Sequence, residues 1–309
     1  MPHIAKRAAA CALMAWAGTA AAATLEVGQG KTYAQPSAAI AAAGVGDTVA
    51  IYPGQYFDCA AVGVRNLTIE GRGDPASVVL TDKTCAGKAI LVIDAPNVTV
   101  RNLTLTRARV PDGNGAGIRR EGGDLAVDGV HFVNNQNGIL TAADPTWSLH
   151  VSNSLFDHNG GCRDACAHGL YAGAIKLVHV EKSRFIGTKE AHHIKSRAAR
   201  TEVLNCDIQD GPDGTASYLV EAPNGGSLIV RGSTLEKGPH AGNHTAAIII
   251  GDEGVTQPTP EITVENNTFT NDMSHRTAFV NNDTATEATL RNNRLHGPVD
   301  PLVGDGSVN

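Results

Sequence analysis

A six-residue phrase that recurs nine times constrains the fold of this chain more than any other feature. Each phrase ends on an apolar residue, and the ends follow one another at intervals of 23 to 36 residues. The end positions are Ile69, Leu105, Phe132, Phe156, Phe185, Ile208, Leu235, Phe269 and Leu295. Five residues before each end the chain has Val in eight phrases and Leu in the ninth. Such a repeat indicates a solenoid, in which each repeat forms one coil of a rod.

Three residues before each end lies a residue that, in most phrases, tolerates positive φ. These positions are Asn66, Asn102, Gly129, Asn153, Lys182, Asn205, Gly232, Asn266 and Asn292. Asn and Gly adopt positive φ more readily than other residues, so we expect each phrase to form a strand, a one-residue corner and a second strand. The next column is small or apolar and should point inward. It consists of Leu67, Leu103, Val130, Ser154, Ser183, Cys206, Ser233, Asn267 and Asn293.

A coil of about 25 residues with a sharp corner and three short strands predicts an all-β protein. The specific prediction is a single-stranded right-handed parallel β-helix, in which strands of successive coils stack ~4.8 Å apart. The alanine-rich segment 36–43 should form a short helix that caps the N-terminal end of this solenoid, with Gly44 ending the helix. We expect residues 24–309 to form one β-helix domain.

The first 23 residues have the layout of a secretory signal peptide. Lys6 and Arg7 precede an apolar run at positions 8–17, and alanines at 21–23 provide a cleavage site. Its removal would change the net charge from −6 to −8, which argues against nucleic acid as a partner. No other segment is apolar enough to suggest a membrane helix. We therefore expect a secreted or periplasmic protein that is monomeric and binds neither membranes nor nucleic acid.

Five cysteines remain after the predicted cleavage, in a compartment that favours disulfides. We expect Cys59 to pair with Cys85, and Cys162 to pair with Cys166 in a tight loop. Cys206 would then be left as a buried thiol in the inward column.

A second set of strands precedes the corner phrases. We expect their apolar residues to face the core: Ile118, Ile139, Leu170, Ile194, Leu219, Ile249 and Phe279. Strand alternation would place the following neighbours outside, namely Arg119, Leu140, Tyr171, Lys195, Val220, Ile250 and Val280. The preceding neighbours should also point outward: Gly117, Gly138, Gly169, His193, Tyr218, Ile248 and Ala278. Three glycines in that last column would leave a shallow groove.

Two segments on adjacent coils, "AHGLY" and "HHIKSRA", bring basic and aromatic residues to this outer face. They contribute His168, Tyr171, His192, His193, Lys195 and Arg197. One interpretation is a solvated surface, which is usual for the outside of a β-helix. The other is a groove that attracts an anion to a protein of negative net charge.

The helix segment followed by "GDTVAIYPGQY", together with the corner phrases, resembles the pectate-lyase-like superfamily of secreted β-helix proteins. The resemblance implies a protein that acts on polysaccharides, since members include lyases, hydrolases, esterases and epimerases, although others have no known catalysis. Locally, "HHIKSRA" is similar to the lysine–serine segment of the chondroitinase-B-like alginate lyases. This similarity implies that Lys195, followed by Ser196, is a catalytic base.

The same similarity does not extend to the residues that bind calcium in those lyases. In those lyases an arginine one coil later assists the reaction, and acidic residues with an asparagine hold calcium. Here the expected outward position carries Val220, and Glu221 is the one acid near it. We therefore expect no cofactor and no metal site, and calcium stays an open possibility.

β-Elimination from a polyuronate needs a base, a group that neutralises the substrate carboxylate and an acid for the leaving oxygen. We assign Lys195 as the base, provided that neighbouring positive charge lowers its pKa. Tyr171 would be the acid, and His193 or Arg119 would neutralise the carboxylate. Substrate binding would involve Arg119, His168, His192, Arg197, Tyr218 and Glu221.

Other activities remain open. A glycosidase needs two carboxylates at a controlled separation, and we expect no such pair on adjacent coils. The alternatives to a lyase are a non-catalytic carbohydrate-binding or cell-surface β-helix protein, or a uronan C5-epimerase.

Overall fold

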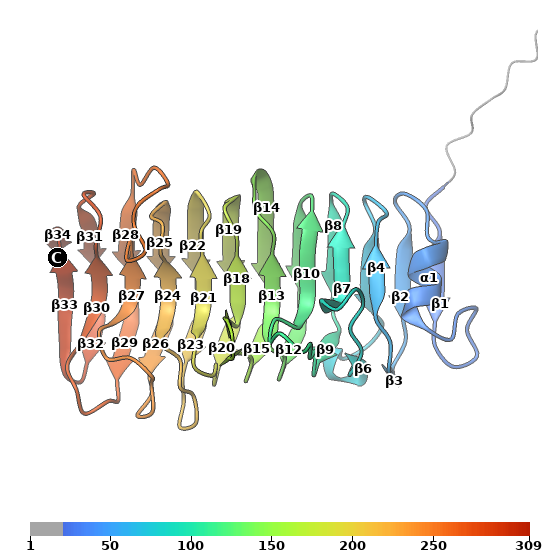
Figure 1. Ribbon diagram of the computed structural model, residues 1–309, viewed down its shortest axis with the longest axis horizontal. Helices are drawn as coiled ribbons and strands as arrows, with labels where there is room; N and C mark the ends of the chain where they lie inside the picture. The colour runs from blue at the N-terminus through green and yellow to red at the C-terminus, as the bar shows by residue number, and fades with distance from the viewer. Residues whose placement is uncertain (1–20) are drawn as a thin grey trace, which may run out of the picture.

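A computed structural model describes residues 21–309, and these form a right-handed parallel β-helix (Figure 1). Three parallel sheets run along the rod. Through most of the length of the rod, each coil contributes one strand to each sheet. The fold class predicted from the repeat is confirmed. The predicted signal peptide, residues 1–23, falls almost entirely outside the described residues.

The longest sheet, here called sheet A, has twelve strands. They are β1 (Thr24–Val27), β2 (Thr48–Ile51), β5 (Thr68–Gly71), β8 (Val98–Arg101), β11 (Leu125–Asp128), β14 (Asp144–Ser152), β19 (Ile175–Glu181), β22 (Arg200–Leu204), β25 (Ser227–Arg231), β28 (Ile262–Glu265), β31 (Ala288–Arg291) and β34 (Gly306–Val308).

Sheet B follows sheet A in each coil and has ten strands. They are β3 (Gly54–Tyr56), β6 (Val78–Thr81), β9 (Thr104–Thr106), β12 (His131–Val133), β15 (Leu155–Asp157), β20 (Arg184–Ile186), β23 (Asp207–Gln209), β26 (Thr234–Lys237), β29 (Thr268–Asn271) and β32 (Arg294–His296). A short 3₁₀ helix, η1 (Pro75–Ser77), precedes β6.

Sheet C completes each coil and faces the viewer in Figure 1. Its ten strands are β4 (Ala60–Val62), β7 (Ala89–Asp94), β10 (Ala116–Gly122), β13 (Asn137–Thr141), β18 (Leu170–Ala172), β21 (His192–Ser196), β24 (Tyr218–Ala222), β27 (Ala246–Ile250), β30 (Thr277–Asn282) and β33 (Val299–Gly304).

One α-helix, α1 (Pro36–Ala42), covers the N-terminal end of the rod (Figure 1). Pro36 occupies the first turn, where its missing N–H costs no hydrogen bond. Ala39 and Ile40 are buried against the first coils. The helix ends one residue earlier than predicted. Within residues 21–309, no helix has the length and apolar character needed to cross a membrane.

Both predicted disulfides are present. Cys59 is bonded to Cys85, and Cys162 is bonded to Cys166. The second bond closes a small antiparallel hairpin of β16 (Gly161–Cys162) and β17 (Cys166–Ala167), which leads directly to His168. Cys206 is a free, buried cysteine, and burial raises the pKa of its thiol to about 11. It is therefore a core residue and not a reactive thiol.

Positive φ is confirmed at all nine predicted corner positions, and eight of them form the corner between sheets A and B. Their φ angles are positive and run from 47° at Lys182 to 64° at Gly232. The inward column that follows is buried at eight positions, with Asn293 partly exposed. Its polar members form a ladder: the amide N–H of Ser154 donates to Ser183, that of Cys206 to Ser233, and that of Ser233 to Asn267.

The first phrase, however, belongs to a different corner. In the predicted alignment Ile69 matched Leu105, but in the structure Ile69 pairs with Val100 inside sheet A. Asn66 therefore lies at the corner between β4 of sheet C and β5 of sheet A. There its side chain accepts a hydrogen bond from the side chain of Asn97. The corner between sheets A and B in this coil is formed by the segment 71–73, because Asn102 one coil later donates to its carbonyls. The local phrase recurs, but the corner that it forms depends on the neighbouring coil.

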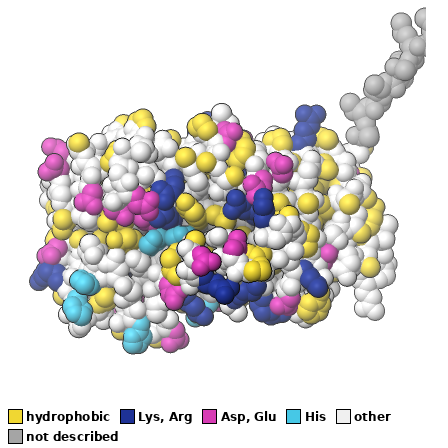
Figure 2. Space-filling model, viewed as in Figure 1, with side chains coloured by type: hydrophobic (Ala, Val, Ile, Leu, Met, Phe, Trp, Pro, Cys, Tyr) yellow, Lys and Arg dark blue, Asp and Glu magenta, His cyan; other side chains and the backbone are white. Residues whose placement is uncertain are grey.

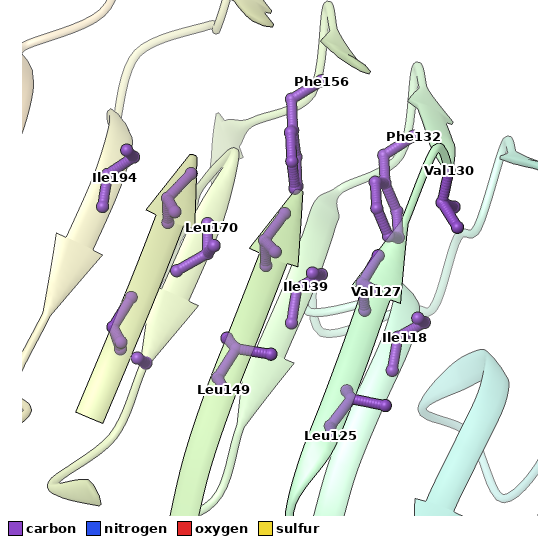
Figure 3. Packing of buried hydrophobic residues seen from close by; sticks show 14 of the residues in the cluster. Ile118, Leu125, Val127, Val130, Phe132, Ile139, Leu149, Phe156, Leu170 and Ile194 are labelled. Atoms are coloured by element: carbon purple, nitrogen blue, oxygen red, sulfur yellow. The ribbon is translucent and has the colours of Figure 1, made fainter. Parts of the chain in front are cut away.

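The interior holds a stack of aromatic rings that explains two of the three glycines in the column before the core residues of sheet C. Phe132 and Phe156 stack at 4.6 Å between ring centroids (Figure 3). Phe156 and Phe185 stack at 4.2 Å. A Cβ atom on Gly117 would lie 2.7 Å from the ring of Phe132, and one on Gly138 equally close to Phe156. These glycines, predicted to leave a groove on the outside, instead face inward and make room for the rings. Gly169, in the same column, would bring a Cβ to 2.5 Å from the carbonyl oxygen of His193.

The register of sheet C is as predicted up to β21 and differs by one residue after it. Ile118, Ile139, Leu170 and Ile194 follow one another in the core. Ile194 then pairs with Val220, and not with Leu219. The core column continues through Ile248 and Val280, so the outer column continues through Glu221, Ile249 and Asn281. The prediction that Val220, Ile250 and Val280 point outward was wrong, because a one-residue slip exchanges the two faces of a strand.

Candidate active site on the outer face of sheet C

The outer face of sheet C carries a polar centre between two apolar patches. One patch consists of Ala89, Val92, Ala116 and Leu140, and the other of Ala246, Ile249 and Ala278. Tyr171 packs against the first patch, and Tyr218 packs against the second. Figure 2 shows a hydrophobic band along this face with cationic, acidic and histidine side chains beside it. The polar centre and the two patches together can accept an elongated ligand that lies along the rod.

Lys195 of β21 is at the centre of the polar cluster. It pairs with Tyr171 of β18 on one side, as predicted, and with Glu221 of β24 on the other. Its Nζ atom lies 3.0 and 2.9 Å from the two carboxylate oxygens of Glu221. A second carboxylate, that of Glu253, approaches the same Nζ at 2.6 Å. Lys195 is thus held between one buried and one partly exposed glutamate.

Arg197, which directly follows this strand, contacts three groups. Its Nε donates to the hydroxyl oxygen of Tyr171 at 2.9 Å, and its Nη2 donates to Glu253 at 2.6 Å. Its Nη1 donates to the side-chain oxygen of Asn224. Lys195 and Arg197 therefore bind the two oxygens of one carboxylate, beside a tyrosine hydroxyl.

The charges of this cluster differ from the sequence prediction. We expected cationic neighbours to lower the pKa of Lys195. Burial does act in that direction, but the attraction of Glu221 and Glu253 outweighs it, and the net pKa of Lys195 is raised. Burial raises the pKa of Glu221 to about 7, although Lys195 opposes that shift. The resting cluster is close to neutral and is not a strongly basic groove.

His168 and His192 form a stack of neutral rings along the centre of the site. Their ring centroids lie 4.9 Å apart, and the ring of Tyr218 continues the stack at 5.2 Å from His192. Burial and the charge of Lys195 lower the pKa of His192 to about 3. Burial likewise brings the pKa of His168 well below its ordinary value. Both imidazoles are neutral near pH 7.

Hydrogen bonds fix the tautomer of His192. Its Nδ1 accepts the backbone N–H of Tyr218 at 3.2 Å, so its proton lies on Nε2, which faces Glu221 at 3.1 Å. Tyr218 thus lies beside His192, and not beside His193 as predicted. His192 orients Glu221, which in turn holds Lys195.

His193 does not belong to this site. Its side chain is fully buried, with Nδ1 2.8 Å from the Thr188 hydroxyl and Nε2 2.9 Å from Asp210. The ring packs edge-on against Phe185, at the end of the phenylalanine stack. The prediction that His193 points outward and neutralises a carboxylate is therefore wrong. The strand turns at the corner between sheets B and C, so the side chains of both His193 and Ile194 face inward.

Arg119 is on the outer face as predicted, but at a distance from Lys195. Three strand steps separate them, through Leu140 and Tyr171, which corresponds to about 14 Å. Arg119 donates from Nε to Glu121 at 2.9 Å and is partly exposed. It can contact a neighbouring unit of a polymer that is bound along the face, but not the group held by Lys195.

Sequence reasoning missed Glu253 and Asn224. Both belong to loops that connect sheet C to sheet A, and Glu253 is 58 residues from Lys195 in sequence. The segment "GDEG" that contains Glu253 was noticeable, because two glycines flank two acids. Nothing in the segment itself indicates which coil it contacts. Within residues 21–309, no group of three or more His, Cys, Asp or Glu side chains is arranged to hold a metal ion.

Comparison with solved structures identifies the architecture. An alginate lyase from Paenibacillus sp. str. FPU-7 matches with a TM-score of 0.58 and 16% identity, over 90% of this chain and 99% of that one. The ORF18 protein of Geobacillus virus E2 matches with a TM-score of 0.56 and 10% identity, over 92% of this chain and 60% of that one. The chain has the right-handed parallel β-helix fold of these proteins. No family model matches the sequence, and no curated protein sequence is significantly similar to it.

Proposed function

We propose that this β-helix protein is a polysaccharide lyase that cleaves uronic-acid linkages by β-elimination. The supporting observation is the geometry around Arg197. One edge of its guanidinium holds a carboxylate together with Lys195, and its Nε holds the hydroxyl of Tyr171. In a uronate, the carbon that carries the carboxylate also carries the proton to be removed. A substrate carboxylate held by Lys195 and Arg197 would therefore bring that C–H bond towards Tyr171.

In the proposed reaction, Lys195 and Arg197 neutralise the carboxylate, which makes the adjacent C5 proton more acidic. The Tyr171 oxygen, in its deprotonated form, takes this proton, and the electrons of the C5–H bond form the C4=C5 double bond. The C4–O bond breaks, and Tyr171 returns the proton to the leaving oxygen. Arg197 lies beside the tyrosine oxygen and stabilises negative charge that develops there.

The role of Lys195 differs from the one inferred from sequence. A lysine base must be neutral when it accepts a proton, and Glu221 and Glu253 stabilise the charged form instead. We therefore propose Lys195 as a cationic partner of the substrate carboxylate. A base role for Lys195 is the alternative, and substitution by arginine separates the two.

The partner in this proposal is an acidic polysaccharide outside the cytoplasm. Two disulfides in the described chain agree with an oxidising compartment. The solved alginate lyase with the same fold supports, without establishing, a uronan as the substrate. We propose a monomer that needs no metal for this chemistry, because the two cations of the site already neutralise the carboxylate.

The test is a panel of polyuronates incubated with the purified protein, with absorbance near 235 nm as the signal of an unsaturated uronide. We expect one polymer to give product, and Tyr171→Phe to lower kcat by ~10²–10⁴-fold, the range for loss of acid–base catalysis. Tyr52→Phe is the matched control and should retain turnover, because the Tyr52 hydroxyl donates to Glu26 in the first coil of the rod and has no contact with Arg197.

Two results would replace the proposal. Deuterium exchange at C5 without unsaturated product would indicate the epimerase alternative, since that reaction shares only the first proton transfer. Binding of a uronan with neither product nor exchange would indicate a carbohydrate-binding protein.

A further inference from the structure

The loop between β27 and β28 places Glu253 against the two cations of the site while leaving its side chain accessible. The backbone is well fixed: the amide of Glu253 donates to Pro223, and the side chain of Asn224 donates to the Gly254 carbonyl. Gly251 and Gly254 turn the chain at φ values of 88° and 92°. The Glu253 side chain nevertheless remains 40% exposed. It can change rotamer without any movement of the loop.

The two glutamates at Lys195 are not equivalent. The side chain of Glu221 is 2% exposed and lies between Lys195 and His192, so it is a permanent part of the site. Glu253 contacts Lys195 with Oε1 and Arg197 with Oε2, and it approaches from the solvent side. Lys195 therefore keeps one carboxylate partner whether or not Glu253 is present.

A uronate carboxylate is the same chemical group as the Glu253 carboxylate. Its exchange for Glu253 would conserve the balance of two cations and two carboxylates in the cluster. Without such an exchange, Lys195 and Arg197 would bring unmatched positive charge into a half-buried position, which is unfavourable. The two cations thus accommodate one removable carboxylate, and in the free protein the chain itself supplies it through Glu253.

We infer that Glu253 is an internal stand-in for the substrate carboxylate, which occupies Lys195 and Arg197 in the free protein and is displaced when a uronan binds. This inference rests on the proposed function, since it names the group that the uronate replaces. The apparent dissociation constant of a ligand equals its intrinsic value divided by the fraction of protein that is free to bind it. If Glu253 occupies the cations nine-tenths of the time, its removal tightens uronate binding about tenfold.

The experiment compares Glu253→Gln and Glu253→Ala with Glu261→Gln. Glu261 is a matched control: it ends the same connecting segment, its side chain is 43% exposed, and it pairs with Arg200 away from the site. The probes are saturated trisaccharides of galacturonate, mannuronate and guluronate. Their dissociation constants are measured by isothermal titration calorimetry, and KM and kcat are measured at 235 nm on the polymer that gives product.

We expect both Glu253 variants to bind the preferred trisaccharide at least ~5-fold more tightly than wild type, and to lower KM without lowering kcat. The Glu261 variant should match wild type. If Glu253 instead positions Lys195 and Arg197, its removal will weaken binding or lower kcat. Unchanged binding in the Glu253 variants would equally overturn the inference.

These outcomes are separable from the proposed function. Tighter binding by the Glu253 variants without any unsaturated product would support the stand-in and reject the lyase. Product from wild type together with unchanged or weaker binding in the Glu253 variants would support the lyase and reject the stand-in. If no trisaccharide binds to wild type or to either variant, both proposals are wrong.

Discussion

Two buried lysines, Lys195 in sheet C and Lys237 in sheet B, have opposite electrostatic surroundings. Lys195 contacts the carboxylates of Glu221 and Glu253, and its pKa is raised even though burial opposes this. The Nζ atom of Lys237 donates to the backbone carbonyl of Ser217 at 2.6 Å, and burial lowers its pKa to about 8. The charge of Asp210 acts against this shift of the Lys237 pKa but does not outweigh burial.

The comparison shows that a shifted pKa alone does not locate a functional site. A lysine base at neutral pH requires a lowered pKa, and Lys237 has one. Yet Lys237 is fully buried, and nothing that binds on the outer face can reach it. Lys195 has the accessible position but retains its proton. Access and local charge must be considered together, and here they favour a cationic role for Lys195.

The largest expected effect tests that cationic role. Lys195→Ala should lower kcat by ~10²–10³-fold, and it should also lower the melting temperature, because it leaves the buried carboxylate of Glu221 without its cationic partner. Lys195→Arg should retain a measurable part of the activity, since it keeps the charge although not the geometry. Kinetics at 235 nm and thermal melts of both variants provide the measurement. Equal losses in the two variants would return the base role to Lys195, because arginine cannot give up its proton near neutral pH.

The second prediction concerns the inner side of the same strand. His193→Ala should lower the free energy of unfolding by about 3–5 kcal/mol, because it leaves the fully buried carboxylate of Asp210 without its imidazole partner. Urea denaturation at pH 7 would measure this. Protein that remains folded should keep near-wild-type turnover. A stable but inactive His193→Ala variant would contradict the separation of the two networks.

The third prediction uses pH to test the burial of Lys237. Its folded-state pKa of about 8 lies below the ordinary value of 10.5. The folded protein therefore binds this proton less tightly than the unfolded chain, and the stability associated with the neutral amine is lost as pH falls from 10.5 to 8. Relative to Lys237→Met, wild type should gain about 3 kcal/mol of unfolding free energy between pH 8 and 10.5. Parallel pH dependence of the two proteins in urea titrations would show that Lys237 is solvated.

The smallest expected effect tests whether Gly117, Gly138 and Gly169 face the core or the solvent. Gly138→Ala should cost about 1–3 kcal/mol, because a Cβ there would lie 2.4 Å from the Gly169 carbonyl and 2.7 Å from Phe156. Gly63→Ala is the control, since a Cβ at Gly63 meets no atom within 4 Å. Differences in urea midpoints between the two variants give the answer. A neutral Gly138→Ala variant would restore the outward orientation predicted from sequence.

Features that are encoded within a few residues could be predicted from the sequence. A corner residue needs positive φ, and Asn and Gly adopt it at little cost, so the corner phrases identified the coils and the β-helix. Spacing along the chain then placed Tyr171 beside Lys195 in one outward column, and it placed the segments of His168 and His192 on adjacent coils. Cysteine count and compartment gave both disulfides.

Tertiary structure decided the remaining features, for two physical reasons. First, the face that a side chain occupies depends on where its strand turns into the corner, and a shift of one residue reverses it. The turn placed His193 and Gly138 inside, and the one-residue shift after β21 brought Glu221 to Lys195. Second, contacts between loops depend on how coils stack. Glu253 reaches Lys195 across 58 residues, and no local pattern specifies that distance. The sequence by itself determined the rod and the column in which Lys195 lies, and the stacking of the coils determined the charges around it.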